Sequence, residues 1–160
     1  MDCYFEKGND LCDFANDYGL HSPLSFRSNV EKTLDFFHAN IPRALVNLVL
    51  VLDVRFVEKL NAGGFVCSIV HQRTCPCGGF PEGNQTDTLN QWIPLYHQQL
   101  VDLVNSGKYD TRNDFTVVIQ PFLAHTALPM SDGEPNYSYF APDCFHFSGL
   151  FIFESSLIFY

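Results

Sequence analysis

The sequence predicts an α/β fold in a single domain, because two β-preferring apolar runs each follow a segment with helical spacing. The first run covers residues 44–52 and is almost uninterrupted in Leu and Val. Such a run is typical of a parallel strand that is buried on both faces. The second run covers residues 115–121 and is expected to be another central strand. A length of 160 residues is enough for one domain with a sizeable core.

The helix before the first strand has a clear start signal. In Ser22-Pro23, serine is a preferred N-cap and proline is favoured at the first helical position, so a helix is predicted from here to about residue 40. Val30, Leu34 and Phe37 share one face of this helix. We expect that apolar stripe to pack on a sheet.

Two further helices are predicted between the strands. A short one covers about residues 54–60, and a longer one begins near Leu89 and ends before Gly107, a typical C-terminal stop. Residues 67–83 are rich in Cys, Gly and Pro and are expected to be irregular and held by cross-links. Residues 122–140 are expected to form a loop.

Composition restricts the function. The net charge is -9 and no Lys/Arg run is present, which argues against binding to nucleic acid or to an anionic membrane surface. The 16 Phe and 7 Tyr residues give a high aromatic share of 15%, which suggests an apolar site or a thick core. Any substrate contact is therefore expected to be apolar, and no cofactor is expected.

Other features indicate a secreted or lumenal protein. The chain has six cysteines, an even number, and acceptor sequons for glycosylation at Asn84 and Asn136. However, its first residues do not resemble a signal peptide, and no apolar segment is long enough to span a bilayer. We therefore expect the chain to be a piece of a longer protein.

The cysteines allow a metal site as an alternative to disulfides. Cys67, His71, Cys75 and Cys77 could supply four zinc ligands from one loop. The spacing is not a common zinc pattern, and Cys-x-Cys would crowd a tetrahedral shell. Disulfides agree better with the sequons.

The strongest candidate site is an Asp-x-x-His unit formed by Asp143 and His146. A carboxylate that hydrogen-bonds one nitrogen of an imidazole fixes its tautomer and leaves the other nitrogen to act as a general base. Asn9 lies near the other end of the chain, in a Gly-Asn-Asp turn after a short apolar stub. Because sites in open α/β sheets lie beyond the carboxyl ends of strands, the fold could bring these residues together.

Several blocks of the sequence, in the same order, resemble animal phospholipase B of the GDSL/SGNH hydrolase superfamily, from about residue 8 to residue 148. They are Gly8-Asn9-Asp10-Leu11-Cys12-Asp13, the Ser22-Pro23 helix, Pro42-Arg43-Ala44-Leu45-Val46-Asn47-Leu48, Cys75-Pro76-Cys77, Tyr109-Asp110-Thr111-Arg112, Asp114-Phe115-Thr116-Val117-Val118 and Phe140-Ala141-Pro142-Asp143-Cys144-Phe145-His146-Phe147-Ser148.

The resemblance implies a flavodoxin-like three-layer α/β/α fold and a Ser-His-Asp hydrolase of phospholipid or lysophospholipid esters, extracellular or at the cell surface. His146 would be the base, Asp143 its orienting partner and Asn9 a donor to the oxyanion. Residues 1–148 would be the later part of the lipase domain, truncated at its N-terminus, and residues 149–160 a divergent apolar tail in place of the family's helix.

The resemblance also implies that the nucleophile is missing. The family's serine lies in a Gly-Asp-Ser-type block before the Gly-Asn-Asp turn, and no serine of these 160 residues lies in a comparable turn. The chain alone is therefore expected to be inactive. A non-catalytic lipid-binding module is the alternative, with a groove lined by aromatic residues: Tyr137, Tyr139, Phe140, Phe145 and Phe147.

Overall fold

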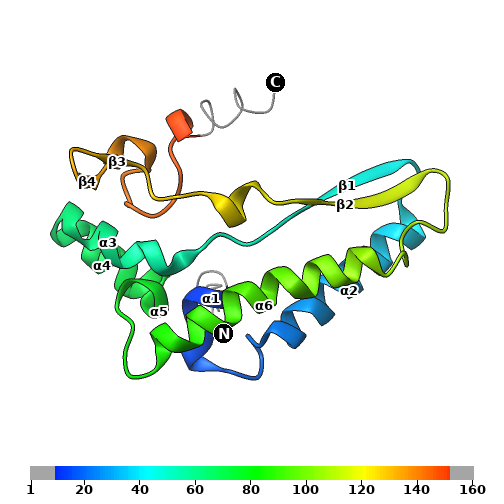
Figure 1. Cartoon of the computed structure of the whole chain (residues 1–160), viewed down its shortest axis with the longest axis horizontal. Helices are drawn as coiled ribbons and strands as arrows, with labels where there is room; N and C mark the ends of the chain where they lie inside the picture. The colour runs from blue at the N-terminus through cyan, green and yellow to red at the C-terminus, as the bar shows by residue number, and fades with distance from the viewer. Residues whose placement is uncertain (1–9, 152–160) are drawn as a thin grey trace, which may run out of the picture. The chain divides into compact units, whose positions relative to one another are not determined.

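The computed structural model describes residues 10–151, and their packing divides them into two units (Figure 1). One unit contains residues 14–53 and 87–126, and it holds the parallel sheet. The other contains residues 10–13, 54–86 and 127–151, and it holds the Asp-x-x-His unit. Each unit is described by itself.

The sheet unit consists of two parallel strands and two long helices. Strands β1 (Ala44–Val49) and β2 (Phe115–Gln120) pair from Ala44 opposite Phe115 to Val49 opposite Gln120. Helices α2 (Pro23–Asn40) and α6 (Gln85–Asn105) lie side by side along this sheet (Figure 1). The predicted α/β class is confirmed by the parallel pairing and the helices beside it.

The core of this unit lies between the helices and the sheet. Leu34 and Leu103 from the helices are buried against Phe115 and Val117 of β2 and against Tyr109, which precedes β2. The partly buried side chains around them are Val30, Phe37, Ala44, Val46, Leu48 and Val104. The predicted apolar stripe of the first helix therefore does pack on the sheet.

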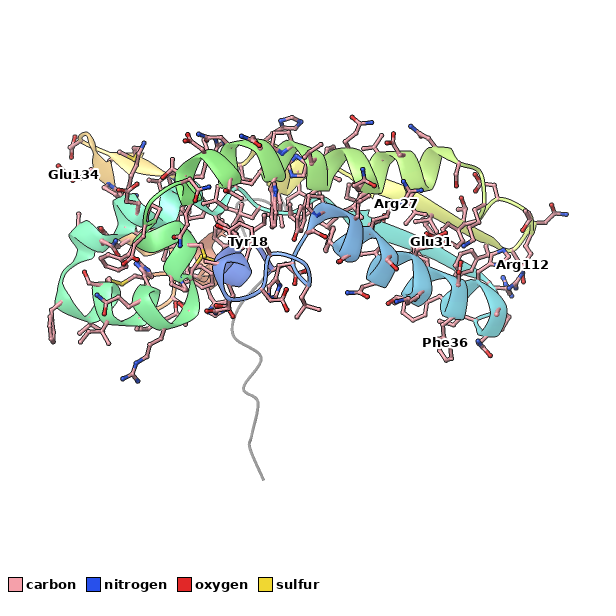
Figure 2. The ribbon with its side chains drawn as sticks, turned by 90° about the horizontal axis from the view of Figure 1, so that it is seen from below. Tyr18, Arg27, Glu31, Phe36, Arg112 and Glu134 are labelled. Carbon is pink, nitrogen blue, oxygen red and sulfur yellow. A yellow bond between two sulfur atoms is a disulfide. The ribbon has the colours of Figure 1, made fainter. Side chains whose placement is uncertain are left out.

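The boundaries of α2 follow its sequence signals. Ser22 is the N-cap and its hydroxyl accepts the backbone N–H of Ser25 at 3.2 Å, with Pro23 as the first helical residue. Phe26 stacks on Tyr96 of α6 at 4.4 Å between ring centroids. Phe36 projects outward from α2 and is 63% exposed (Figure 2).

The first strand differs from its prediction in length and in burial. It ends at Val49 rather than at residue 52, and its side chains alternate between half-buried and exposed, with Leu45 63% exposed. The prediction of burial on both faces was therefore wrong. Alternate side chains point to opposite faces of a strand, and the helices α2 and α6 cover only the face of Ala44, Val46 and Leu48.

Short helices dominate the other unit. In chain order they are α1 (Asp10–Asp13), η2 (Val54–Phe56), α3 (Val57–Leu60), η3 (Asn61–Gly63), α4 (Phe65–Thr74) and α5 (Pro76–Gly79). The predicted helix over residues 54–60 is confirmed.

The expectation that residues 67–83 are irregular was wrong, because most of this segment is helical. Its prolines and Gly83 lie at helix ends or outside the helices: Pro76 is the first residue of α5, and Pro81 and Gly83, with φ +56°, follow α5. The predicted cross-links are present as disulfides between Cys12 and Cys75 and between Cys67 and Cys144.

The remaining described elements are small. Phe14–Asn16 forms η1 and Phe122–His125 forms η4 in the sheet unit. In the other unit, β3 (Met130–Ser131) and β4 (Glu134–Pro135) form a hairpin that is followed by η5 (Tyr137–Tyr139). The predicted loop thus contains short elements, and α6 begins four residues before its predicted start at Leu89.

Three expectations concern the apolar tail, the apolar stub near the N-terminus and the presence of membrane-spanning segments. The backbone is helical over residues 149–151, the described part of the apolar tail that is expected to replace the family's helix. The rest of the tail and the apolar stub before Asn9 lie outside the described residues. No helix in the described part is both long and apolar enough to cross a membrane.

Candidate active site

Asp143 and His146 form a closed local pair in the loop that follows η5. The Nδ1 atom of His146 lies 2.6 Å from Oδ2 of Asp143. The other carboxylate oxygen, Oδ1, accepts the backbone N–H groups of Phe145 and His146, each at 3.0 Å. One carboxylate therefore organises the turn and orients the imidazole at the same time.

This geometry assigns the two ring nitrogens of His146 different tasks. When Nδ1–H donates to a carboxylate, the neutral imidazole carries its lone pair on Nε2. The His146 side chain is 70% exposed and the Asp143 side chain is 35% exposed. A solvent-accessible imidazole with an unprotonated Nε2 can accept a proton from a hydroxyl group.

The environment keeps Asp143 ionised. Partial burial works to raise the pKa of Asp143, but hydrogen bonds from the His146 ring and from the two backbone amides outweigh it and hold the pKa below its ordinary value. The carboxylate therefore stays negative at neutral pH, and a negative carboxylate stabilises the imidazolium that forms when Nε2 takes up a proton.

Backbone hydrogen bonds close the loop at its base. Ala141 donates to the His146 carbonyl at 2.8 Å, and Ser148 donates to the Tyr139 carbonyl at 2.9 Å. Phe140 and Phe147 face each other across an antiparallel bridge, with ring centroids 5.9 Å apart. The Asp143–His146 pair therefore lies at the tip of a closed hairpin-like loop.

The loop is also attached to α4 through Cys144. The Cys144 side chain forms the disulfide with Cys67, and its carbonyl oxygen lies 3.0 Å from Nε2 of His71. His71 is fully buried, and its Nδ1 lies 2.6 Å from Oδ1 of Asn61. Burial lowers the pKa of His71, although its bond to the Cys144 carbonyl and the charge of Asp143 act in the opposite direction.

These contacts exclude the zinc alternative. Cys67 and Cys75 are in disulfides, and both ring nitrogens of His71 have protein partners. Cys77 is buried. No cluster of potential metal ligands is present among the described residues.

The remaining candidate residues are Asn9 and the aromatic side chains that were predicted to line a groove. Asn9 lies outside the described residues, so its distance from His146 is not defined. Several of the aromatic side chains proposed to line a groove contact other protein groups: Tyr137 donates to the Leu60 carbonyl at 3.2 Å, Phe140 packs against Phe56, and Phe147 stacks on Phe151. In the described structure these side chains stabilise the loop.

Sequence reasoning missed the contribution of α4 to the site. The signal was a cysteine between Asp143 and His146, together with Cys67 and His71 at helical i, i+4 spacing. That spacing was interpreted as a possible set of metal ligands. In the structure, both residues instead bind Cys144 in the loop that carries Asp143 and His146.

Comparison with known proteins identifies the family. The model of the GDSL-like lipase/acylhydrolase family matches residues 5–150. The chain belongs to this family. The membership confirms the family resemblance drawn from the sequence blocks.

Three curated proteins also resemble the chain. It is 44% identical over 149 residues to "Phospholipase B1, membrane-associated" of Homo sapiens, 38% identical to the Mus musculus protein and 39% identical to the Rattus norvegicus protein. Each alignment covers 90% of this chain and 10% of the relative, so the chain spans about a tenth of their length. No solved structure matches the chain.

Proposed function

We propose that this chain supplies the histidine and aspartate of a phospholipase B-like active site that cleaves acyl esters of phospholipids or lysophospholipids. The observation that carries this proposal is the 2.6 Å bond between His146 Nδ1 and Asp143 Oδ2 in a member of the GDSL-like lipase/acylhydrolase family. Such a pair prepares the opposite ring nitrogen to activate a serine.

In the proposed mechanism, His146 Nε2 takes the proton of the serine hydroxyl while the serine oxygen attacks the ester carbonyl. The imidazolium then gives this proton to the departing glycerol oxygen, so an acyl-serine and an alcohol are formed. His146 next removes a proton from water, which attacks the acyl-serine, and the imidazolium returns this proton to the serine oxygen as the acyl–oxygen bond breaks and the fatty acid is released. Asp143 holds the imidazole and stabilises its charged form in both steps.

Asn9 is proposed to donate from its side-chain amide to the oxyanion of each tetrahedral intermediate. The Gly8-Asn9-Asp10 block supports this role through its resemblance to the family's corresponding block. A donor of this kind contributes about 3–4 kcal/mol of transition-state stabilisation in comparable sites.

The serine is proposed to come from a Gly-Asp-Ser-type block outside these 160 residues. The two serines beside the catalytic loop have other partners: the Ser148 hydroxyl donates to the Ser138 carbonyl at 2.7 Å, and the Ser138 hydroxyl donates to Asn136 at 2.7 Å. The 160-residue chain alone should therefore show no ester hydrolysis above background.

A fusion tests this assignment. The segment that precedes the matched region in human phospholipase B1 is placed before residue 1, and hydrolysis of lysophosphatidylcholine is measured for the fusion and for the 160-residue chain. We expect turnover from the fusion alone. His146→Ala should abolish it, and Asp143→Asn should reduce it by about 10⁴-fold.

The matched control is His125→Ala, which removes another exposed histidine and should leave the rate unchanged. A folded fusion without turnover, or turnover that survives His146→Ala, would contradict the assignment. Turnover by the unfused chain would show instead that its own serines suffice.

We also propose that this active site works outside the cell or at its surface. The two disulfides support this location, since such bonds persist in oxidising compartments and are rare in the cytosol. Thiol counting under denaturing conditions on protein made in the cytosol and in a secretory system would test it. Equal folding and activity with all thiols reduced would contradict it.

A further inference from the structure

We infer that His71 is a positioning residue for the catalytic base, acting with the Cys67–Cys144 disulfide to hold the backbone between Asp143 and His146. The inference rests on the proposed function in taking Asp143–His146 as the catalytic pair. Its structural part, a clamp from α4 onto Cys144, is measurable without turnover.

The clamp consists of two bonds from one face of α4 to a single residue. Cys67 and His71 are four residues apart in α4, so they lie one turn apart on the same face. Cys67 binds the side chain of Cys144, and His71 binds its carbonyl oxygen. A bond to the side chain and another to the backbone together restrict both the position and the orientation of Cys144.

Cys144 is the residue whose conformation makes the catalytic turn possible. Its φ of +59° lies in the left-handed region, which non-glycine residues rarely adopt. This turn allows Oδ1 of Asp143 to receive the amides of Phe145 and His146 while Oδ2 receives the His146 ring. Fixing Cys144 in this conformation therefore fixes the carboxylate on which His146 depends.

His71 is itself held in place for this task. Asn61 donates from Nδ2 to the Gly79 carbonyl at 2.7 Å, which leaves its Oδ1 facing Nδ1 of His71 at 2.6 Å. His71 is fully buried, so water does not compete for its bond to the Cys144 carbonyl. Both partners of the ring are acceptors and a neutral imidazole carries a single N–H, so the inference places that N–H on Nε2, where it donates to the Cys144 carbonyl.

Two substitutions of similar polarity separate the clamp from general packing. In His71→Gln, the longer side chain places its amide nitrogen near the position of imidazole Nε2 and can still donate to Cys144. In His71→Asn, the shorter side chain can reach only the partner of Nδ1. Gln72→Asn is the control, because it shortens an exposed neighbour on α4.

The primary readout is the tautomer of His146 in the 160-residue chain, measured from its ring ¹⁵N shifts at a pH where an ordinary histidine is neutral. Wild type, Gln72→Asn and His71→Gln should show mainly the Nδ1–H tautomer. His71→Asn and Cys67→Ser should show comparable amounts of both tautomers. A folded His71→Asn chain with the wild-type tautomer ratio would overturn the inference.

Folding of each variant is checked by circular dichroism, with the Cys12–Cys75 disulfide still present. If His71→Asn does not fold, Cys67→Ser and Cys144→Ser decide, and an unchanged tautomer in either would overturn the clamp. If none of these variants folds, the test is a titration of the wild-type chain with reductant, in which the tautomer ratio of His146 is measured. The tautomer ratio must then change as the Cys67–Cys144 bond is lost and before global unfolding, and its constancy over that range would overturn the clamp.

The fusion described above gives a second readout. His71→Asn should lower kcat by about 10²-fold with little change in KM, because it misplaces the base and not the substrate, and His71→Gln should restore most of the loss. If the tautomer changes as expected but the fusion is inactive, the proposed function fails and the clamp stands. If the fusion is active and His71→Asn changes neither readout, the clamp fails and the function stands.

Discussion

Removal of the Tyr109 hydroxyl tests the packing of the sheet unit and its response to alkaline pH. Tyr109 is 2% exposed in the core between α2 and β2. Its hydroxyl lies 2.9 Å from Oδ1 of Asp35 and 3.2 Å from the carbonyl of Glu31, two residues of α2 (Glu31 is labelled in Figure 2). Lys108 balances the two carboxylates, with Nζ 2.7 Å from Glu31 and 2.6 Å from Asp35.

Burial, followed by the hydrogen bond to the Asp35 carboxylate, raises the pKa of Tyr109 from 10.0 to about 12. The folded chain therefore holds this proton more tightly than the unfolded chain. The resulting stability is fully present below pH 10 and is lost as the pH rises toward 12. For these two pKa values, the free energy of unfolding falls by about 1 kcal/mol at pH 11 because of Tyr109 alone.

Tyr109→Phe keeps the ring and removes the titrating group. At pH 7 the variant should be less stable by about 1.5–3 kcal/mol, since the lost hydrogen bond goes to a charged group. This difference should shrink by about 1 kcal/mol between pH 8 and pH 11. Urea unfolding followed by tryptophan fluorescence at each pH measures it.

The comparison with the variant cancels other alkaline effects. The pKa of Lys108 is also raised, mainly by its hydrogen bonds to Asp35 and Glu31, so the stability contributed by its ion pairs begins to fall above pH 10.5 in both chains. Disulfide exchange also becomes faster with pH in both. Tyr18→Phe, which alters a tyrosine that is 43% exposed, is the control and should show no such convergence with wild type. A constant difference between wild type and Tyr109→Phe from pH 8 to pH 11 would refute the reasoning.

Two further predictions concern stability alone. Leu34→Ala should lower the free energy of unfolding by about 2–5 kcal/mol in urea titrations, because Leu34 is 2% exposed in the same core. The control Leu24→Ala, at a position 69% exposed, should cost less than about 1 kcal/mol. Equal losses would contradict the assigned core. Ser22→Ala should cost about 1 kcal/mol through loss of the α2 N-cap, and Ser22→Asp should retain most of that stability; an unchanged unfolding midpoint in Ser22→Ala would show that the cap is not used.

The elements that could be predicted from the sequence are those whose start and stop signals lie next to them in the chain. The start of α2 follows from Ser22 and Pro23, and the end of α6 follows from Gly107, whose φ of +69° suits a glycine. Both strands were predicted because a short run of mostly β-branched and leucine residues between turn signals favours a buried strand. What the runs could not show is which face is covered, since Leu45 and Val46 are equally apolar but only Val46 faces the helices.

Helix α4 was missed for a different reason. Its segment contains Cys67, His71 and Cys75, residue types that are shared by zinc sites, disulfides and buried hydrogen-bond networks. Residue types alone do not separate these uses. What distinguishes disulfides from a zinc site is the pairing of Cys75 with Cys12 and of Cys67 with Cys144. These partners are far away in sequence and come close only in the folded chain.

The candidate site also combines contacts that are local in sequence with contacts from a distant helix. All hydrogen bonds that orient His146 toward Asp143 are formed within four consecutive residues, so an Asp-x-x-His window is sufficient to reveal them. The left-handed turn at Cys144 that permits these bonds is instead held from a distance, by Cys67 and His71. The Asp143 carboxylate contacts the His146 ring locally, and α4 contacts the residue between them from a distant part of the sequence. If Asp143 and His146 act as proposed, an intact Asp-x-x-His motif is therefore not sufficient for a competent base, and a change in α4 that leaves every residue of the motif untouched should disable it.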